Sequence, residues 1–216
     1  VLNTSLSKSI PVNKSSFDEM KFRQVPQDVF SINEEEIAFD LNYITSAVLR
    51  LEQYGESEDS WHRVVDNFVM SIIGLLAKKN NFALRLDRNR SDTSRMSALQ
   101  SRPDMLCWLP NGQLGFKGEE KAYASEFSKA CDELTSKMAK WNAVLFGALP
   151  FQLCYAFAGG YIQFFALDLV KNDGKLYPVT DVIDLQSSTQ NRCLLVRVVV
   201  NCFRVLRTLA KYLEGD

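Results

Sequence analysis

Two acids and a lysine in the middle of the chain, Asp104, Glu119 and Lys121, could do chemistry together. They lie within residues 101–122, where two runs rich in apolar residues flank Asn111-Gly112. That dipeptide best fits the positive φ angles of a two-residue type I′ turn, so it predicts a β-hairpin. The hairpin places Asp104 opposite Glu119, with Cβ atoms about 4.5 to 5.5 Å apart. Lys121 shares their face because side chains alternate along a strand.

The turn also sets the pairing of the two strands. If Pro110 faces Gln113, the numbers of all facing residues add up to 223, which is the sum for 104 and 119. Glu120 then points to the opposite face of the sheet from its neighbours. A shift of one residue would reverse every side chain, so this register is the central expectation.

Two like charges that face each other across a sheet are destabilising, so Asp104 and Glu119 need a compensating partner. A divalent cation is such a partner, because Mg²⁺ is held by one or two carboxylates together with water and substrate phosphates. A nearby lysine such as Lys121 can polarise or deprotonate the attacking water. The three residues therefore predict a Mg²⁺ site, with Mn²⁺ as a substitute, for phosphodiester hydrolysis. The alternative is a purely structural domain with a salt bridge between Asp104 and Lys121.

A helix predicted over residues 58–79 could bring a further acid to this site. Glu58 continues its apolar stripe backward by three residues and is the first candidate, whereas Asp66 lies off the stripe and is the second. An acid favoured by the dipole at a helix start is the other interpretation of Glu58. His62 has no histidine or cysteine partner at ligand spacing. The stripe itself consists of Trp61, Val65, Phe68, Ile72 and Leu75.

Length and composition favour one domain with a full core. The chain has 216 residues, of which 46% are hydrophobic, and no apolar run reaches the roughly 18 residues of a membrane span. Its five cysteines form no C-x-x-C pair, which predicts buried thiols rather than a zinc site or a disulfide framework. The formal net charge of -1 argues against coating of nucleic acid by bulk electrostatics, but it allows a local basic track.

The basic residues near the hairpin are candidates for that track. Arginines in or near a polar loop over residues 87–100 either are solvated or contact a phosphate backbone. The arginines and the lysine on the exposed face of the last helix are either solvated, part of a nucleic-acid track or part of a partner surface. The predicted nucleic-acid-binding residues are Arg90, Arg95, Arg102 and Lys117.

The rest of the chain predicts elements around the hairpin. Residues 1–30, with Pro11 and Pro26, predict a linker or an arm that lies on the domain, and residues 31–216 predict the domain itself. The start at Val1, without a methionine or signal region, predicts a fragment or processed product. One helix is expected to begin at residue 33, and further helices are expected over 58–79, 124–149 and 189–213. Strands are expected over 82–86, 151–158 and 161–169, with an edge strand or loop at 178–185.

The order helix, strand, hairpin, helix, hairpin resembles the PD-(D/E)XK nuclease superfamily. The motif residues are Pro103-Asp104, fourteen intervening residues and Glu119-Glu120-Lys121. The resemblance covers about residues 56–170 and implies an α/β fold with a restriction-endonuclease-like core. In that core a mixed sheet is flanked by helices in the order α-β-β-β-α-β, here with an N-terminal and a C-terminal helix added.

By this resemblance Glu58, Asp104 and Glu119 would be metal-site acids, and Lys121 would orient or activate water. Glu58 and Trp61 also resemble a Glu-x-x-Trp pattern that opens the first core helix in fungal members. The chain is similar, more narrowly, to the nuclease-like modules of Crinkler-type effectors, which precede a kinase-like domain. That implies a domain of a secreted effector that acts on nucleic acid, DNA rather than RNA, in the host cell nucleus. The competing interpretation is a catalytically inactive module that binds nucleic acid or a kinase-like partner domain.

Overall fold

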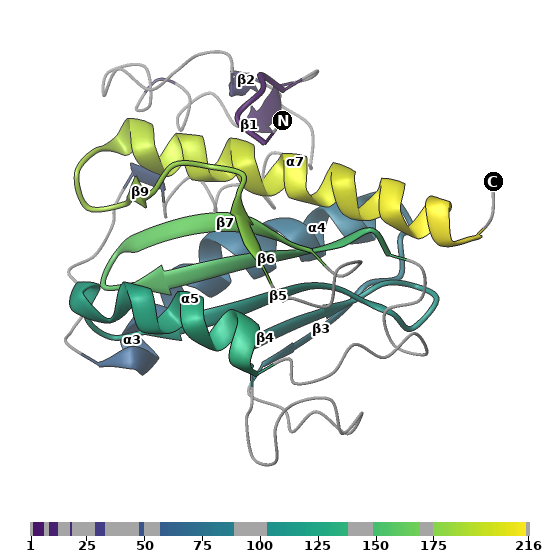
Figure 1. Ribbon diagram of the computed structural model, residues 1–216. Coiled ribbons are helices and arrows are strands. Elements are labelled where there is room, and N and C mark those ends of the chain that lie inside the picture. Colours follow the sequence, from purple (N-terminus) through teal and green to yellow (C-terminus); the bar gives the residue numbers. More distant parts are fainter. Residues whose placement is uncertain are drawn as a thin grey trace.

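The protein is an α/β structure with a mixed, open sheet of seven strands and helices packed on both faces (Figure 1). This architecture confirms the predicted α/β class and the mixed sheet flanked by helices. The computed structural model describes residues 2–6, 9–12, 18, 29–32, 48–49, 57–88, 103–137, 149–168 and 175–214.

The strand order in the sheet is β3-β4-β5-β6-β7-β8, and β9 also pairs with β7. β5 and β6 run parallel, and every other pair in this sheet is antiparallel. A parallel pair needs a crossover connection, and the segment between β5 and β6 contains a helix. The strands are β3 (Arg85–Arg88), β4 (Met105–Trp108), β5 (Leu114–Lys121), β6 (Phe151–Ala158), β7 (Tyr161–Asp168), β8 (Leu176–Pro178) and β9 (Ile183–Asp184).

The predicted hairpin is formed by β4 and β5, but its turn differs from the prediction. Leu109 donates its N–H to the carbonyl of Gln113 at 2.7 Å, which encloses a loop of three residues. Only Gly112 in this loop has a positive φ, of 82°. A type I′ turn needs positive φ at Asn111 as well, so the predicted turn type is wrong, and the loop is the three-residue kind that ends in a left-handed glycine.

The predicted register is nevertheless confirmed, because a bulge offsets the longer loop. Trp108 faces Leu114, yet the preceding residue Cys107 faces Phe116, so Gly115 is the extra residue. A Cβ at Gly115 would lie 2.8 Å from Leu109 Cγ, so the bulge has no room for a side chain. The facing pairs whose numbers add up to 223 are Met105 with Gly118, Leu106 with Lys117 and Cys107 with Phe116.

The predicted helix over 58–79 is present as one continuous helical segment. It comprises α3 (Glu58–Val65), a π-helical turn η1 (Asp66–Met70) and α4 (Ser71–Lys79). Ser57 caps its start by accepting a hydrogen bond from the Ser60 N–H. The wider π turn inserts a residue into the helical repeat, so the buried stripe shifts: Ile73 and Ala77 are buried, whereas the predicted Leu75 is only half-buried.

Helices lie on both faces of the sheet (Figure 1). α3, η1 and α4 pack on one face together with α7 (Thr189–Glu214), which matches the predicted last helix. The other face is covered by α5 (Phe127–Ser136), preceded by a 3₁₀ turn, η2 (Ala124–Glu126). The prediction of one helix over 124–149 holds as far as Ser136, where α5 ends, and residues 138–148 lie outside the described part of the chain.

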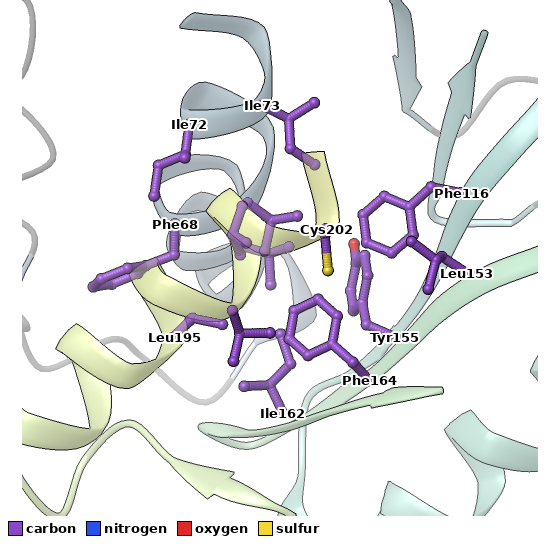
Figure 2. Close-up of a cluster of buried hydrophobic side chains, with 14 of the residues drawn as sticks. Phe68, Ile72, Ile73, Phe116, Leu153, Tyr155, Ile162, Phe164, Leu195 and Cys202 are labelled. Atoms are coloured by element: carbon purple, nitrogen blue, oxygen red, sulfur yellow. The ribbon is translucent and has the colours of Figure 1, made fainter. Parts of the chain in front are cut away.

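The core between the sheet and the α4 and α7 layer is apolar (Figure 2). The Tyr155 ring extends along this face past Gly118, where a Cβ would lie only 1.9 Å from Tyr155 Cζ. Four of the five cysteines are buried and all five are free thiols, as predicted. The core side chains labelled in Figure 2 are Phe68, Ile72, Ile73, Phe116, Leu153, Tyr155, Ile162, Phe164, Leu195 and Cys202.

The other four strand predictions have different outcomes. β6 and β7 are confirmed, and their turn Gly159-Gly160 has positive φ at both residues. The strand predicted at 82–86 begins three residues later, because Asn81 adopts a positive φ of 49° and the Phe82 N–H still bonds back to Ala77 at the helix end. Residues 178–185, predicted as an edge strand or loop, include the last residue of β8, the two residues of β9 and the loop between them.

Part of the N-terminal segment packs on α7, on the side away from the sheet (Figure 1). β1 (Ile10–Val12) and β2 (Phe30–Ile32) form a separate parallel pair. Asn201 of α7 donates hydrogen bonds to the carbonyls of Leu2 and Thr4, at 2.9 and 3.0 Å. Of the helix predicted from residue 33, only residues 48–49 are described, and they are helical. No described helix is long and apolar enough to cross a membrane.

Candidate metal and catalytic site

Asp104 lies directly before β4 and is 7% exposed. Its Oδ2 accepts a hydrogen bond of 2.6 Å from the backbone N–H of Glu120 on the neighbouring strand. Burial raises the pKa of the Asp104 carboxyl, and the Glu120 N–H opposes that shift by stabilising the carboxylate. Asp104 is therefore a nearly enclosed acid fixed to the strand that carries the other candidates.

Glu119 on β5 is fully buried and points toward α5. Its Oε2 forms an ion pair with Lys137 Nζ, whereas its Oε1 has no hydrogen-bond partner within the described residues. Burial and then the charge of Asp104 raise the pKa of Glu119 to about 8, although Lys137 acts in the opposite direction. The β4 and β5 register and the hydrogen bond from the Glu120 N–H place Asp104 beside Glu119.

Lys121 lies on the same face of β5, and Glu120 faces the other way, as predicted. Lys121 Nζ pairs with Glu133 Oε2 of α5 at 2.9 Å. Burial disfavours the Lys121 ammonium, but the Glu133 hydrogen bond and the charge of Asp104 outweigh it, so the pKa of Lys121 is raised. Lys121 is therefore held in its charged form beside Asp104, and its ion pair is with Glu133.

Glu58 is the first residue of α3 and is half-buried. Burial and the charge of Asp104 raise the pKa of Glu58, and the charge of Lys121 lowers it. The helix start thus brings Glu58 within electrostatic range of both residues. The second choice for a helix acid, Asp66, instead pairs with Arg88 Nε at 2.6 Å and belongs to a different cluster.

Lys137 and Glu133 complete the site, and the sequence reasoning missed both. Lys137 immediately follows α5 and pairs with Glu133 at 2.9 Å as well as with Glu119. A chain of alternating charges results, in the order Lys121, Glu133, Lys137 and Glu119. The i,i+4 spacing of Glu133 and Lys137 was a detectable signal for their own pair, but not for the contact with the strand.

No group of three or more histidine, cysteine, aspartate or glutamate side chains in the described part of the chain is arranged to hold a metal ion. The residues that fit one are Asp104 and Glu119, since Mg²⁺ typically takes one or two carboxylates and keeps several waters. The buried Glu119 Oε1 supports this fit, because a buried carboxylate oxygen without a partner has unused acceptor capacity.

The predicted nucleic-acid contacts receive little support from residue positions. Arg90, Arg95 and Arg102 lie outside the described residues. Lys117 is fully buried, donates to the Leu134 carbonyl, and has a pKa lowered by burial. A surface phosphate cannot reach such a side chain, because Lys117 lies between β5 and α5.

The environment of Arg88 also differs from the two that were expected, a solvated loop or a contact with a phosphate backbone. It is a β3 residue with a side chain only 19% exposed, and it forms ion pairs with Asp66 and Glu120. With the fully buried Glu120 it belongs to a second polar cluster, on the face of β5 opposite Glu119. We call this cluster the Glu120 network, and its members are His62, Asp66, Arg88, Glu120 and Tyr155.

The fold and the site define an α/β protein with a buried pair of acids and two flanking lysines. Comparison of the chain with models of known protein families, with curated proteins and with solved structures gives no match. The functional argument therefore depends on the geometry and charge of these side chains.

Proposed function

We propose that this protein is a Mg²⁺-dependent nuclease that hydrolyses phosphodiester bonds, with DNA as the preferred substrate. The observation that carries the proposal is the buried Asp104 and Glu119 pair, in which Glu119 Oε1 has no partner among the described residues. Lys121 lies on the same face with its ammonium held charged. This arrangement supplies cation ligands and a proton donor at one place, which is what phosphodiester hydrolysis requires.

The order of elements supports a restriction-endonuclease-like core for the same proposal. The α3 and α4 segment, β3, β4, β5, α5 and β6 follow one another in the order α-β-β-β-α-β. β3, β4 and β5 are an antiparallel meander, and β6 joins β5 in parallel after the α5 crossover. The proposed site lies where the β4 and β5 hairpin meets α3 and α5.

Each residue has a distinct role in the proposal. Asp104 and Glu119 would hold the cation, with Glu58 as a candidate third acid. The bound cation would supply positive charge against the negative charge that develops on the phosphate. Lys121, kept charged by Glu133, would orient the attacking water and stabilise negative charge as the water loses its proton.

Lys137 supplies the counter-charge of Glu119 when no cation is bound. A divalent cation at Glu119 and the Lys137 ammonium would therefore compete for the same carboxylate. Since Glu133 also binds Lys137, the ammonium has a second acidic partner at 2.9 Å if Glu119 is taken by a cation.

A second candidate function is a catalytically inactive nuclease-like module that binds nucleic acid or a kinase-like partner domain. The Glu119 and Lys137 ion pair favours it, because an ammonium already compensates the acid. Membership of a secreted effector and action in a host nucleus remain predictions from the resemblance alone.

Cleavage of supercoiled plasmid in Mg²⁺, Mn²⁺ or EDTA tests the proposal. We expect metal-dependent nicking by the wild type, and a loss of at least about 100-fold in Asp104→Asn and Lys121→Met. Asp104→Asn retains an acceptor for the Glu120 N–H, so its fold should persist. Glu126→Gln is the matched control, since Glu126 is an acid directly before α5 whose ion pair is with Lys129.

Retained cleavage in both Asp104→Asn and Lys121→Met would contradict the proposed site. A folded wild type that cleaves neither DNA nor RNA, but still binds one of them, would instead support the inactive module. Nicking that is equal in all variants and in EDTA would reveal a contaminating nuclease.

A further inference from the structure

Glu120 is a fully buried acid whose two oxygens both have partners on the face opposite Glu119. Oε2 bonds to His62 Nδ1 of α3, and Oε1 accepts a 2.6 Å hydrogen bond from the Tyr155 hydroxyl. Arg88 Nη2 lies 3.0 Å from the same Oε1. Glu120 therefore joins a helix and strands β3 and β6 at a single carboxylate.

Arg88 extends this connection to the start of β4. Its Nη2 donates to the His62 carbonyl at 3.1 Å and its Nη1 to the Asp104 carbonyl at 3.4 Å. Its Nε is bound by Asp66 at 2.6 Å, which fixes the guanidinium plane. Burial opposes the charge of Arg88, but Glu120 and its other partners raise the Arg88 pKa further above its usual range.

The Glu120 network and the acid site meet at Asp104. The Glu120 N–H donates to Asp104 Oδ2 at 2.6 Å, while Arg88 binds the carbonyl of the same residue. Both the side chain and the main chain of Asp104 are thus held by residues whose own side chains point to the other face of the sheet.

The network also places the helix that carries Glu58. His62 is four residues after Glu58, so the two side chains lie one above the other on α3. The bond from His62 to Glu120 fixes that face of α3 against β5. The separation between Glu58 and the acids of the hairpin therefore depends on this bond.

Stability alone gives no sufficient reason for such a network. Replacing a buried ion cluster with apolar residues of similar volume is often neutral or stabilising, because burying charges is costly. We infer that His62, Arg88 and Glu120 are positioning residues that fix Asp104 and Glu58 relative to Glu119. This inference rests on the proposed function, since it assigns the network to the same cation site.

Two His62 variants separate positioning from bulk packing. His62→Leu removes the donor to Glu120, whereas His62→Asn keeps an amide N–H near the position of Nδ1. Leucine is the better helix former, so any effect of helix propensity would favour the variant expected to fail. Arg192→Met is the control for general destabilisation, because this buried arginine bonds to Val48 and Leu185 instead.

The first readout needs neither metal nor substrate. Amide hydrogen exchange in EDTA reports whether the Glu120 N–H still bonds to Asp104, with the Phe116 amide of the same strand as the internal reference. Relative to Phe116, the exchange of Glu120 should become about tenfold faster in His62→Leu, as for loss of one hydrogen bond to a charged group. It should change little in His62→Asn and in Arg192→Met.

The second readout is Mn²⁺ affinity by calorimetry together with plasmid cleavage. His62→Leu should lose about 10- to 100-fold in Mn²⁺ affinity and in kcat, as supporting residues behind metal ligands do. The KM for DNA should stay close to the wild-type value, and His62→Asn should recover most of the loss.

Unchanged Glu120 exchange in a folded His62→Leu would overturn the positioning role, whatever the protein does. Failure of the proposed function would be recognised separately, as a wild type that neither binds Mn²⁺ nor cleaves. In that case the exchange result still decides whether the network holds Asp104.

Discussion

The charge of the buried Glu119 carboxyl depends mainly on its burial, on Asp104 and on Lys137. The interior and Asp104 disfavour its charge, and Lys137 favours it. Burial lowers the pKa of Lys137, but Glu119 and Glu133 outweigh burial and raise that pKa, so the ammonium stays charged. The ammonium is therefore the group that makes a charged Glu119 tolerable while no metal is bound.

Lys137→Met should destabilise the metal-free protein by about 1 to 3 kcal/mol, because it leaves a buried carboxylate oxygen without its donor. Adding Glu119→Gln should recover most of that loss, since a neutral amide needs no counter-charge. Urea unfolding in EDTA at pH 9, where the wild-type Glu119 is largely charged, measures both variants. If the double variant shows the simple sum of the two single effects, the residues are not coupled.

His62 should make stability depend on pH. The hydrogen bond to Glu120, which exceeds the effect of burial, raises the pKa of His62 above 6.5 in the folded protein. Its contribution is then fully present below about pH 6.5 and is lost as the pH rises through the higher folded pKa. Relative to His62→Asn, the wild type should lose stability between pH 6 and 9. If the free energy of unfolding in urea changed with pH by the same amount in both proteins, the raised pKa of His62 would be contradicted.

At the level of elements, the hairpin of β4 and β5 shows what the sequence could and could not predict. The alternation of side chains along β5 followed from the period of two, whereas the register beside Asp104 was predicted from a two-residue turn in which Pro110 faces Gln113, and in the structure Leu109 bonds to Gln113 instead. The loop type did not follow, because Asn111-Gly112 is compatible with two- and three-residue loops and the bulge at Gly115 restores the pairing. Two departures from the predicted turn thus cancel at the site.

Gly118→Ala should destabilise the hairpin more than Gly112→Ala does. A Cβ at 118 would overlap the buried Tyr155 ring, and overpacking of this kind costs about 1 to 3 kcal/mol or more. Gly112 has φ +82° but no atom within 4 Å of an added Cβ, so only backbone strain of about 1 kcal/mol applies. Urea unfolding compares the two, and equal losses would show that Tyr155 can move aside.

Contacts between side chains of different elements could not be predicted from the sequence, for a physical reason. Helical periodicity shows which face of α5 or α3 is apolar, but it does not give how far along the sheet each helix lies. The contact of Lys137 with Glu119 and that of His62 with Glu120 both depend on this placement. Residue types and spacing could therefore predict the acids and Lys121, while the surrounding ion pairs needed the structure.

For the whole molecule, α7 joins the sheet to the N-terminal segment. One side of this helix packs on the sheet, and on the other side Asn201 binds the carbonyls of Leu2 and Thr4. The expected arm over residues 1–30 is thus tied to the domain where it is described. The α/β class, the two hairpins and the first and last helices of the core could be predicted from periodicity, because each is a long and regular pattern.

Asn201→Ala should loosen that attachment. Its side-chain amide is the donor to two backbone carbonyls, so its removal should cost about 1 to 3 kcal/mol and expose residues 2–6 to protease. Limited digestion with chymotrypsin, which can cleave after Leu2 and Leu6, followed by mass spectrometry measures the effect, with a Thr208→Ala variant at an exposed position of α7 as control. A wild-type digestion pattern in Asn201→Ala would show that other contacts hold the segment.

The central claim is that Asp104 and Glu119 hold a divalent cation. Anomalous diffraction from crystals soaked in Mn²⁺ tests it directly, with Glu119→Gln crystals treated in parallel. The account predicts a manganese peak in contact with both carboxylates in the wild type and no peak at that place in the variant. A wild-type map without manganese there, with Lys137 still bound to Glu119, would contradict it.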